Sequence, residues 1–167
     1  MTILIQSAKI AKYNEAVDFI STHMRKSDED ECMRLAGMCP RDALLYSMAH
    51  SEDVEVWMCE PTGQWMGVSG IGQGDNKREG VPWLLCTDHV LEHPVSAMKL
   101  ARKQLGQWKE RYHTLYNMMD ASNDLARGFC ESLGFTFGEP EAWAPANHAA
   151  PPSWVRRFSW EAGQCAP

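Results

Sequence analysis

Residues 87–105, TDHVLEHPVSAMKLARKQL, contain the pattern H-x-x-E-H at His89, Glu92 and His93. Two histidines one helical turn apart, with a glutamate beside the second, are the signature of inverted zinc peptidases, in which the histidines bind zinc. This chemistry requires both histidines on one face of an α-helix. Pro94 directly follows His93, and a residue before proline is disfavoured in the α conformation. We therefore expect a turn at residues 89–93, a helix that begins at Pro94, and no metal site.

The same stretch joins an apolar strand candidate, residues 82–87, to a long helix candidate, residues 94–112. In α/β proteins such a connection can bind phosphate, because the N–H groups and the dipole at a helix N-terminus attract anions. A second stretch, GIGQGDNKREG at residues 70–80, resembles a dinucleotide-binding motif in its glycines. That motif must open a helix, whereas the residues after Gly74 show no apolar periodicity. We therefore interpret residues 70–80 as the flexible end of a hairpin.

The composition indicates one globular domain over residues 1–167. The chain has 44% hydrophobic and 23% charged residues, and no apolar run approaches the roughly 20 residues of a membrane helix. The net charge of −6 and the pI near 5.5 argue against a dedicated nucleic-acid binder. The six cysteines are scattered without a CxxC pair, which is typical of reduced thiols and excludes a zinc ribbon. The first residues lack the features of a signal peptide, so we expect a cytoplasmic protein without membrane contact.

Hydrophobic periodicity and turn residues divide the chain into helices and strands. The N-terminal part, residues 1–80, is expected to hold strands at 2–6, 53–60 and 65–71 and helices at 11–24, 27–35 and 40–49, with Ser27 as the N-cap of the second helix. The core, residues 82–137, is expected to hold a strand buried on both faces at 82–87, a helix at 94–112, a strand at 113–119, a helix at 123–133 and a strand at 136–137. A Pro/Ala-rich loop at 140–153 then leads to a closing strand at 154–160.

In its order of strand, loop, helix, strand and helix, the core resembles the GNAT family of acyl-CoA N-acyltransferases. Its most specific part, NDLARGFCESLGF, is similar to that family's N-x-x-A-x-x-[FL]-Y-x-x-x-G-F helix. The matching positions are Asn123, Ala126, Phe129, Gly134 and Phe135. The resemblance implies an α/β (α+β) fold: a mixed, mostly antiparallel sheet with two splayed central parallel strands, and helices on both faces.

The resemblance also implies acetyl-CoA as the cofactor. Its pantetheine arm would pair with the edge of the first splayed strand, and its pyrophosphate would bind the N-terminus of the following helix. The implied cofactor-binding residues are Leu85, Cys86, Thr87, Val95, Ser96, Ala97, Lys99 and Asn123. The family's loop, [QR]-x-x-G-x-[GA], aligns with residues 92–97, where only Ala97 fits. Glu92 repels a pyrophosphate and Val95 replaces a glycine that lets the backbone approach it, so this loop departs from the pattern.

Candidate catalytic residues follow from the same resemblance. Members of the family commonly use a tyrosine of the 123–135 helix as the acid that protonates the leaving thiolate, and Cys130 occupies the matching position. A thiol can serve in this role, and a buried structural cysteine is the alternative. Asp88 and His89, at the end of the splayed strand, are the candidate general bases. Glu55 and Glu60 on the preceding hairpin are weaker candidates.

A narrower resemblance covers about residues 83–137. The segments WLLCTDHVLEH, QWKERYHTLYNMMDASN and LARGFCESLGFTF look like the internal-virion-protein-A-like, acetyltransferase-like proteins of podophages. This implies a bacteriophage protein made in the host bacterial cytoplasm and associated with virion assembly. Two functions stay open: transfer of an acetyl group from acetyl-CoA to an amine acceptor, or a catalytically degenerate protein that binds a phage structural protein or a host factor. An acceptor pocket would be built from residues 21–49 and 140–153.

Overall fold

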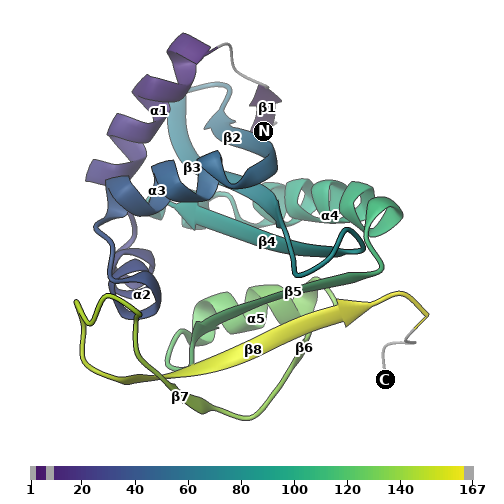
Figure 1. The fold of residues 1–167 in the computed structure, drawn as a ribbon. Coiled ribbons are helices and arrows are strands. Elements are labelled where there is room, and N and C mark those ends of the chain that lie inside the picture. Colours follow the sequence, from purple (N-terminus) through teal and green to yellow (C-terminus); the bar gives the residue numbers. More distant parts are fainter. Residues whose placement is uncertain (1–2, 7–9, 164–167) are drawn as a thin grey trace.

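The structure is a computed structural model that describes residues 3–6 and 10–163, with side chains described for residues 13–163. The helices (Figure 1) are α1 (Ile10–Thr22), α2 (Lys26–Ala36), α3 (Pro40–Ala49), the 3-10 helix η1 (Asp88–Glu92), α4 (Pro94–Arg111) and α5 (Asp124–Ser132). The strands are β1 (Ile3–Gln6), β2 (Ser51–Cys59), β3 (Gln64–Gln73), β4 (Glu79–Cys86), β5 (Thr114–Asp120), β6 (Thr136–Phe137), β7 (Glu141–Trp143) and β8 (Ser153–Glu161).

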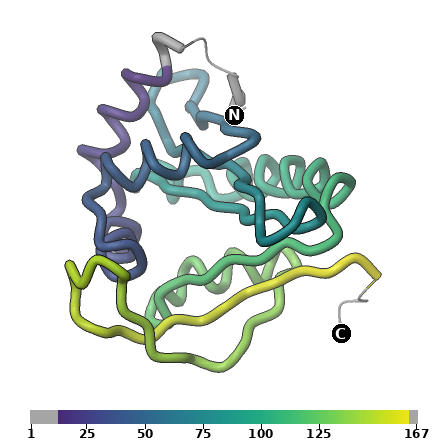
Figure 2. Tube along the Cα trace, viewed as in Figure 1, coloured from purple at the N-terminus to yellow at the C-terminus, as the bar shows by residue number. Residues whose placement is uncertain are grey.

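One sheet runs through the molecule in the strand order β1-β2-β3-β4-β5-β8-β6, and β7 pairs with the other part of β8. Every pair is antiparallel except β4 and β5, which are parallel neighbours at the centre. β8 lies beside β5 and pairs with all of its residues, although the two strands are far apart in sequence (Figure 2). The two halves of the sheet therefore meet only at the β4–β5 pair.

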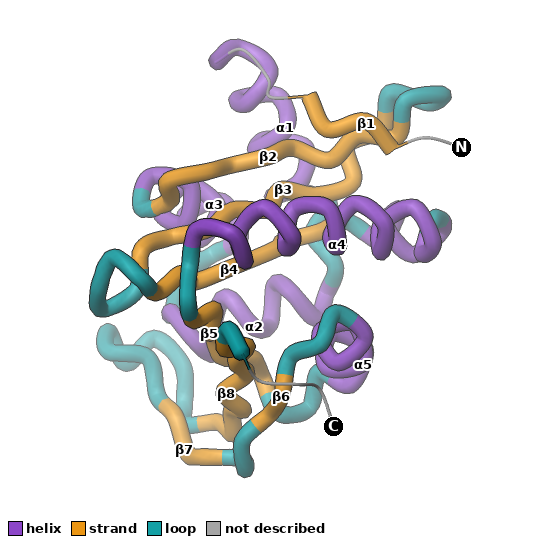
Figure 3. Tube along the Cα trace, turned by 90° about the vertical axis from the view of Figure 1, so that its right-hand side faces the viewer, coloured by secondary structure: helices purple, strands orange, loops and turns teal. Residues whose placement is uncertain are grey.

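Helices cover both faces of the sheet, with α4 and α5 on one face and α1, α2 and α3 on the other (Figure 3). On the α1–α3 face, helices pack against the sheet through a core that includes Ile20, Leu44 and Val68. On the opposite face, α4 packs Leu100 and its neighbours against β2, β3 and β4, and a further core joins α4 to β5, α5 and β8. Trp108 belongs to that last core. Along β4, side chains alternate between two of these cores: Leu84 and Cys86 pack on the α4 face, and Trp83 and Leu85 pack on the α1–α3 face.

The central parallel strands separate soon after they meet. Their pairing is confined to Glu79 with Thr114 and Gly80 with Leu115. Pro82, two residues further along β4, has no N–H to continue the ladder toward β5. Its carbonyl instead accepts a hydrogen bond from the side-chain amide of Asn117 on β5, at 2.9 Å. Pro82 is thus a local cause of the separation of β4 from β5.

The structure confirms the expected fold class, a mostly antiparallel sheet with two splayed central parallel strands and helices on both faces. The predicted turn at residues 89–93 is confirmed as η1, and α4 begins at Pro94. The hairpin prediction is also confirmed, although β3 and β4 extend further than expected and leave only residues 74–78 as the connection. In the described part of the chain, no helix has the length and apolar character needed to cross a membrane.

Three local expectations were wrong. Ser27 does not cap α2, because the helix begins one residue earlier and the Ser27 hydroxyl contacts Asp28 instead. Residues 82–87 are not buried on both faces, because β4 borders the opening, and Trp83, Leu84 and Leu85 are half-buried. The expected loop at 140–153 contains β7, which is held by β8 and by a hydrogen bond from the Trp143 indole N–H to the Leu35 carbonyl at 2.9 Å.

Candidate functional site

A cavity of about 670 Å³ lies where β4 and β5 separate. Its wall includes Ala97 of α4 and Phe129 of α5 from one face of the sheet, and Cys32 of α2 and Tyr46 of α3 from the other. The cavity therefore connects the two faces through the gap between the central strands. Its volume is within the ~300–1,000 Å³ typical of small-molecule sites.

Alternate residues of β4 direct their backbone groups toward this gap. The Thr87 N–H donates to the Met66 carbonyl of β3 at 2.9 Å, so Thr87 and Leu85 use their backbone on the β3 side. Leu84 and Cys86, like Pro82, therefore direct theirs toward the gap. Because β5 pairs only with residues 79 and 80 of β4, no strand in the described part of the chain covers Leu84 on this side.

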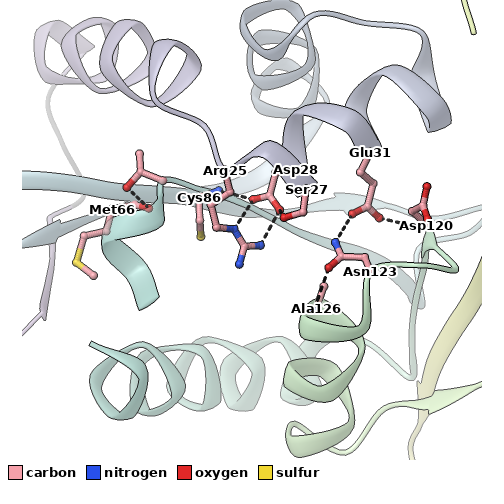
Figure 4. A network of polar contacts seen from close by, with 10 residues as sticks. Arg25, Ser27, Asp28, Glu31, Met66, Cys86, Asp120, Asn123 and Ala126 are labelled. Carbon is pink, nitrogen blue, oxygen red and sulfur yellow. Dashed lines mark hydrogen bonds and ion pairs between the residues drawn. The ribbon is translucent and has the colours of Figure 1, made fainter. Parts of the chain in front are cut away.

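The backbone of Cys86 is already engaged by the segment that opens α2 (Figure 4). The Cys86 N–H donates to the Asp28 carboxylate at 2.9 Å, and the Cys86 carbonyl accepts the Arg25 N–H at 2.8 Å. The Arg25 guanidinium pairs with the same carboxylate at 2.6 Å, and Asp28 is only 3% exposed. Burial opposes the charge of Arg25, but the attraction of Asp28 outweighs it and raises the pKa of the guanidinium. Leu84 and Cys86 both direct their backbone groups toward the gap. Of these two residues, Leu84 alone keeps its N–H and carbonyl available for a ligand in the described part of the structure.

Glu31 of α2 is a carboxylate on the cavity wall. One of its oxygens accepts the Asp120 N–H and the other accepts the Asn123 side-chain amide, both at 2.9 Å (Figure 4). Burial raises the pKa of Glu31 to about 7 and outweighs the two hydrogen bonds, which lower it; the charges of Asp28 and Asp120 add smaller upward contributions. A carboxylate with this pKa exchanges protons readily near neutral pH, which is the requirement for a general base.

The sequence offered only a weak signal for Glu31. It belongs to the acidic run SDEDE, which looks like a solvated first turn of a helix. Helical spacing nevertheless places Asp28 and Glu31 on one face, three residues apart. Glu29 and Asp30 lie on the other side and pair with the exposed Lys26. Because its partners lie 89 and 92 residues away, the burial of Glu31 was not visible in the sequence.

Asn123 was predicted to lie near the pantetheine arm. In the structure it is the N-cap of α5, and its side-chain oxygen accepts the Ala126 N–H at 3.2 Å. Its amide group holds Glu31 at the same time. Asn123 thus fixes both the start of α5 and the position of the Glu31 carboxylate, and its predicted contact with a cofactor stays a prediction.

Cys130 of α5 lies on the cavity wall, as the prediction of a proton donor requires. Burial raises the pKa of its thiol to about 12, with smaller contributions from Glu31 and Glu131. The thiol therefore stays protonated at neutral pH and is a weaker acid than a free thiol. A leaving thiolate in the same apolar cavity is subject to the same desolvation, so proton transfer between the two sulfurs stays chemically open.

The predicted bases Asp88 and His89 lie in η1 and do not contribute to the cavity wall among the described residues. Asp88 is exposed, and the His89 ring lies 3.2 Å from the Glu92 carboxylate. His93 faces a different partner, the Cys59 sulfur at 3.9 Å. The H-x-x-E-H residues therefore share no α-helical face. Within residues 13–163, no three His, Cys, Asp or Glu side chains are grouped so that they could hold a metal ion.

The predicted cofactor residues divide between the cavity and the surface. Leu85, Cys86 and Ala97 line the cavity, whereas Thr87 is buried against β3 and Ser96 is half-buried. Val95 is 67% exposed, and Lys99 is exposed on the outer face of α4.

The two ends of the cavity differ in their fit to acetyl-CoA. The gap beside Leu84 suits a narrow amide-bearing arm. The α4 N-terminus suits a diphosphate poorly, since the Pro94 ring removes an N–H and Glu92 carries a negative charge nearby. Leu91 of η1 and Val95 of α4, on either side of the α4 N-terminus in sequence, are exposed, as is Leu125 at the start of α5. The residues therefore fit the thioester arm and do not fit the diphosphate.

No protein-family model matches the chain, and no curated protein matches it by sequence. Solved structures of low sequence identity share its fold. The ribosomal-protein-alanine N-acetyltransferase of Brucella melitensis has a TM-score of 0.68 at 13% identity, over 95% of this chain and 99% of that one. A GNAT-family acetyltransferase of Streptococcus pneumoniae has a TM-score of 0.65 at 15% identity, over 95% and 99%. The protein yncA of Salmonella typhimurium, solved with its cofactor acetyl-CoA, has a TM-score of 0.65 at 12% identity, over 100% and 98%. The chain has the GNAT fold.

Proposed function

We propose that this chain is a member of the GNAT superfamily that transfers an acetyl group from acetyl-CoA to an amine. The observation that carries the proposal is Glu31, a carboxylate with a pKa of about 7 on the wall of a cavity that opens between the two splayed strands. The fold and the N-acetyltransferases that share it support the same reaction.

The residues of the chain divide the work of this reaction. When bound, acetyl-CoA supplies an acetyl group activated as a thioester. Glu31 accepts a proton from the acceptor ammonium and leaves the free amine that can attack a carbonyl. The Leu84 N–H is directed into the gap, where it can donate to an oxygen that gains negative charge. Cys130 stays the proposed donor of a proton to the leaving sulfur. The walls hold the amine and the arm together and exclude water.

The direct test is amine-dependent release of free thiol from acetyl-CoA at pH 8, with purified chain and a panel of primary amines. The proposal predicts release that requires both the amine and the protein. Release that is equal with and without every amine, together with no acetyl-CoA binding, would contradict it.

A second candidate function is favoured by one observation. Leu91 and Val95 beside the α4 N-terminus and Leu125 at the start of α5, three residues that we call the rim, are 47%, 67% and 56% exposed. An exposed apolar rim is typical of a protein-binding surface. The alternative is therefore a catalytically degenerate phage protein that binds a virion component or a host factor in the bacterial cytoplasm. It predicts that thiol release is absent while charge substitutions at this rim abolish partner binding.

The residues at the α4 N-terminus also allow a prediction of which parts of acetyl-CoA contribute to its binding. S-Acetylpantetheine lacks the nucleotide and the diphosphate but keeps the arm and the thioester. Because Glu92 and Val95 offer little to a diphosphate, we expect its dissociation constant to lie within about tenfold of that of acetyl-CoA, equivalent to less than ~1.4 kcal/mol. Calorimetry with both donors at the same ionic strength measures this ratio. A preference for acetyl-CoA above about a hundredfold, ~2.8 kcal/mol, would show that the α4 N-terminus binds the diphosphate after all.

Asn123 provides a test of how Glu31 is positioned. Replacing Asn123 with serine keeps an N-cap oxygen but removes the amide that hydrogen-bonds to the Glu31 carboxylate. That hydrogen bond lowers the pKa of Glu31, so its loss raises the pKa. We expect the pH at which turnover is half-maximal to move upward from about 7.

The matched variant Asn123→Ala removes both the cap and the amide. It should show the same upward shift of the pH profile and, in addition, a loss of about 1 kcal/mol in the free energy of unfolding. An unchanged pH profile in both variants would mean that Asn123 does not act through Glu31.

A further inference from the structure

The part of the cavity on the α2–α3 side of the sheet is where an acceptor amine would reach Glu31. We call it the acceptor chamber. Besides Glu31, its wall includes Cys32, Leu35, Met38, Tyr46, Trp83 and Leu85. Trp83 and Leu85 point to this side because they pack with the α1–α3 core, whereas Leu84 and Cys86 pack with α4. The chamber wall is therefore mainly aliphatic and aromatic.

The negative charge of Glu31 is not balanced by a cation among the described residues of the chamber wall. Glu31 accepts hydrogen bonds from a backbone N–H and from a neutral amide, and no cation pairs with it among the described residues. Arg25 is the cation on the wall, and it is neutralised by its ion pair with the buried Asp28. The two cations of α2 itself do not contribute to the wall: Lys26 pairs with Glu29 and Asp30, and Arg34 pairs with Asp120. A carboxylate or phosphate on the acceptor would thus enter a low-dielectric space without a counter-ion, which is costly.

We infer that the acceptor is a small primary amine carried on an apolar, aromatic body without an anionic group. This inference rests on the proposed acetyl transfer and names its substrate class. The ammonium group meets Glu31, which has no ion-pair partner among the described residues. The apolar body meets Leu35, Met38 and Trp83, and the rings of Tyr46 and Trp83 can stack with it or contact its cation.

A matched pair of probes tests this directly. 2-Phenylethylamine and phenylalanine share the amine and the ring, and they differ by the α-carboxylate alone. 1,4-Diaminobutane carries an amine without any apolar ring. We expect kcat/KM for 2-phenylethylamine to exceed that of each of the other two by at least a hundredfold with acetyl-CoA at pH 8.

Binding gives a readout that does not depend on turnover. Calorimetry of the three amines against the chain without donor should show the same order of affinity. The variant Met38→Arg places a cation at the half-buried edge of the chamber. In this variant, the ratio of the affinity for 2-phenylethylamine to that for phenylalanine should fall about tenfold or more. The dissociation constant of acetyl-CoA should stay unchanged.

The outcomes separate the two proposals. Equal or better binding and turnover of phenylalanine or 1,4-diaminobutane overturns the inference, and acetyl transfer to them would leave the proposed function standing. Absence of thiol release and of acetyl-CoA binding overturns the proposed function. Selective calorimetric binding of 2-phenylethylamine in that case would still support the chamber as a site for apolar amines.

Discussion

Replacing Glu31 with glutamine is expected to lower kcat by roughly 10²–10⁴-fold, the usual contribution of a general base. Glutamine has nearly the same shape and can still accept a hydrogen bond from Asn123 or from the Asp120 N–H, but it cannot take a proton from an ammonium group. The effect should fall on kcat more than on the KM for acetyl-CoA, because Glu31 lies on the acceptor side of the cavity. Steady-state thiol release at pH 8 measures it.

Glu29→Gln is the matched control for this variant. Glu29 lies on the same helix, has an exposed side chain and pairs only weakly with Lys26 at 3.6 Å. The Glu29→Gln variant should have the same kcat as the wild type. Turnover of the Glu31→Gln variant within a factor of two of the wild type would remove Glu31 from the mechanism and return the choice of base to other groups.

Replacing Asp28 with alanine is expected to cost about 3–5 kcal/mol in the free energy of unfolding, the usual result of removing one partner of a buried ion pair. The change leaves the Arg25 guanidinium without its partner and the Cys86 N–H without an acceptor. Domains of this size are typically stable by only ~5–15 kcal/mol, so a large part of the stability depends on this contact. Urea unfolding followed by tryptophan fluorescence measures the loss.

Two further variants separate charge from hydrogen bonding at this position. Asp28→Asn keeps an oxygen for the Cys86 N–H but loses the charge, and should fall between the alanine variant and the wild type. Asp30→Ala removes an exposed carboxylate that pairs with Lys26 at 2.9 Å. Exposed pairs contribute about 0–1 kcal/mol. An Asp28→Ala loss as small as that of Asp30→Ala would mean that the α1–α2 segment is not anchored to β4 through Asp28.

Much of the fold could be predicted from the sequence because its signals are local. Apolar periodicity and turn residues indicated the long helices, and the α5 segment carried a motif that includes Asn123 and Gly134, which the structure places at the start of the helix and just past its end. Gly134 has a φ of 89°, which a glycine adopts without strain. The position of the strand opening also has a local cause in Pro82.

The chemistry of the site was harder to predict because it depends on distant partners. Glu31 belongs to a charged run, and its raised pKa arises only when α2 packs over the end of β5 and the start of α5. Asp88 and His89 follow the splayed strand directly in sequence, but the 3-10 turn carries them away from the cavity. The short strand β7 likewise depends on β8 and on a Trp143 contact with α2, 108 residues away.

The most direct test of the central claim is calorimetry of acetyl-CoA binding to the wild type and to Leu84→Pro. Proline at 84 removes the N–H directed into the gap but leaves the β3 ladder intact, as Pro82 already does two residues earlier. Leu84→Ala keeps the N–H and controls for loss of the side chain. We predict wild-type binding with a dissociation constant between about 1 μM and 1 mM, weakened about tenfold by Leu84→Pro relative to Leu84→Ala. No binding at millimolar acetyl-CoA, or equal binding by Leu84→Pro and Leu84→Ala, would contradict a pantetheine site between β4 and β5.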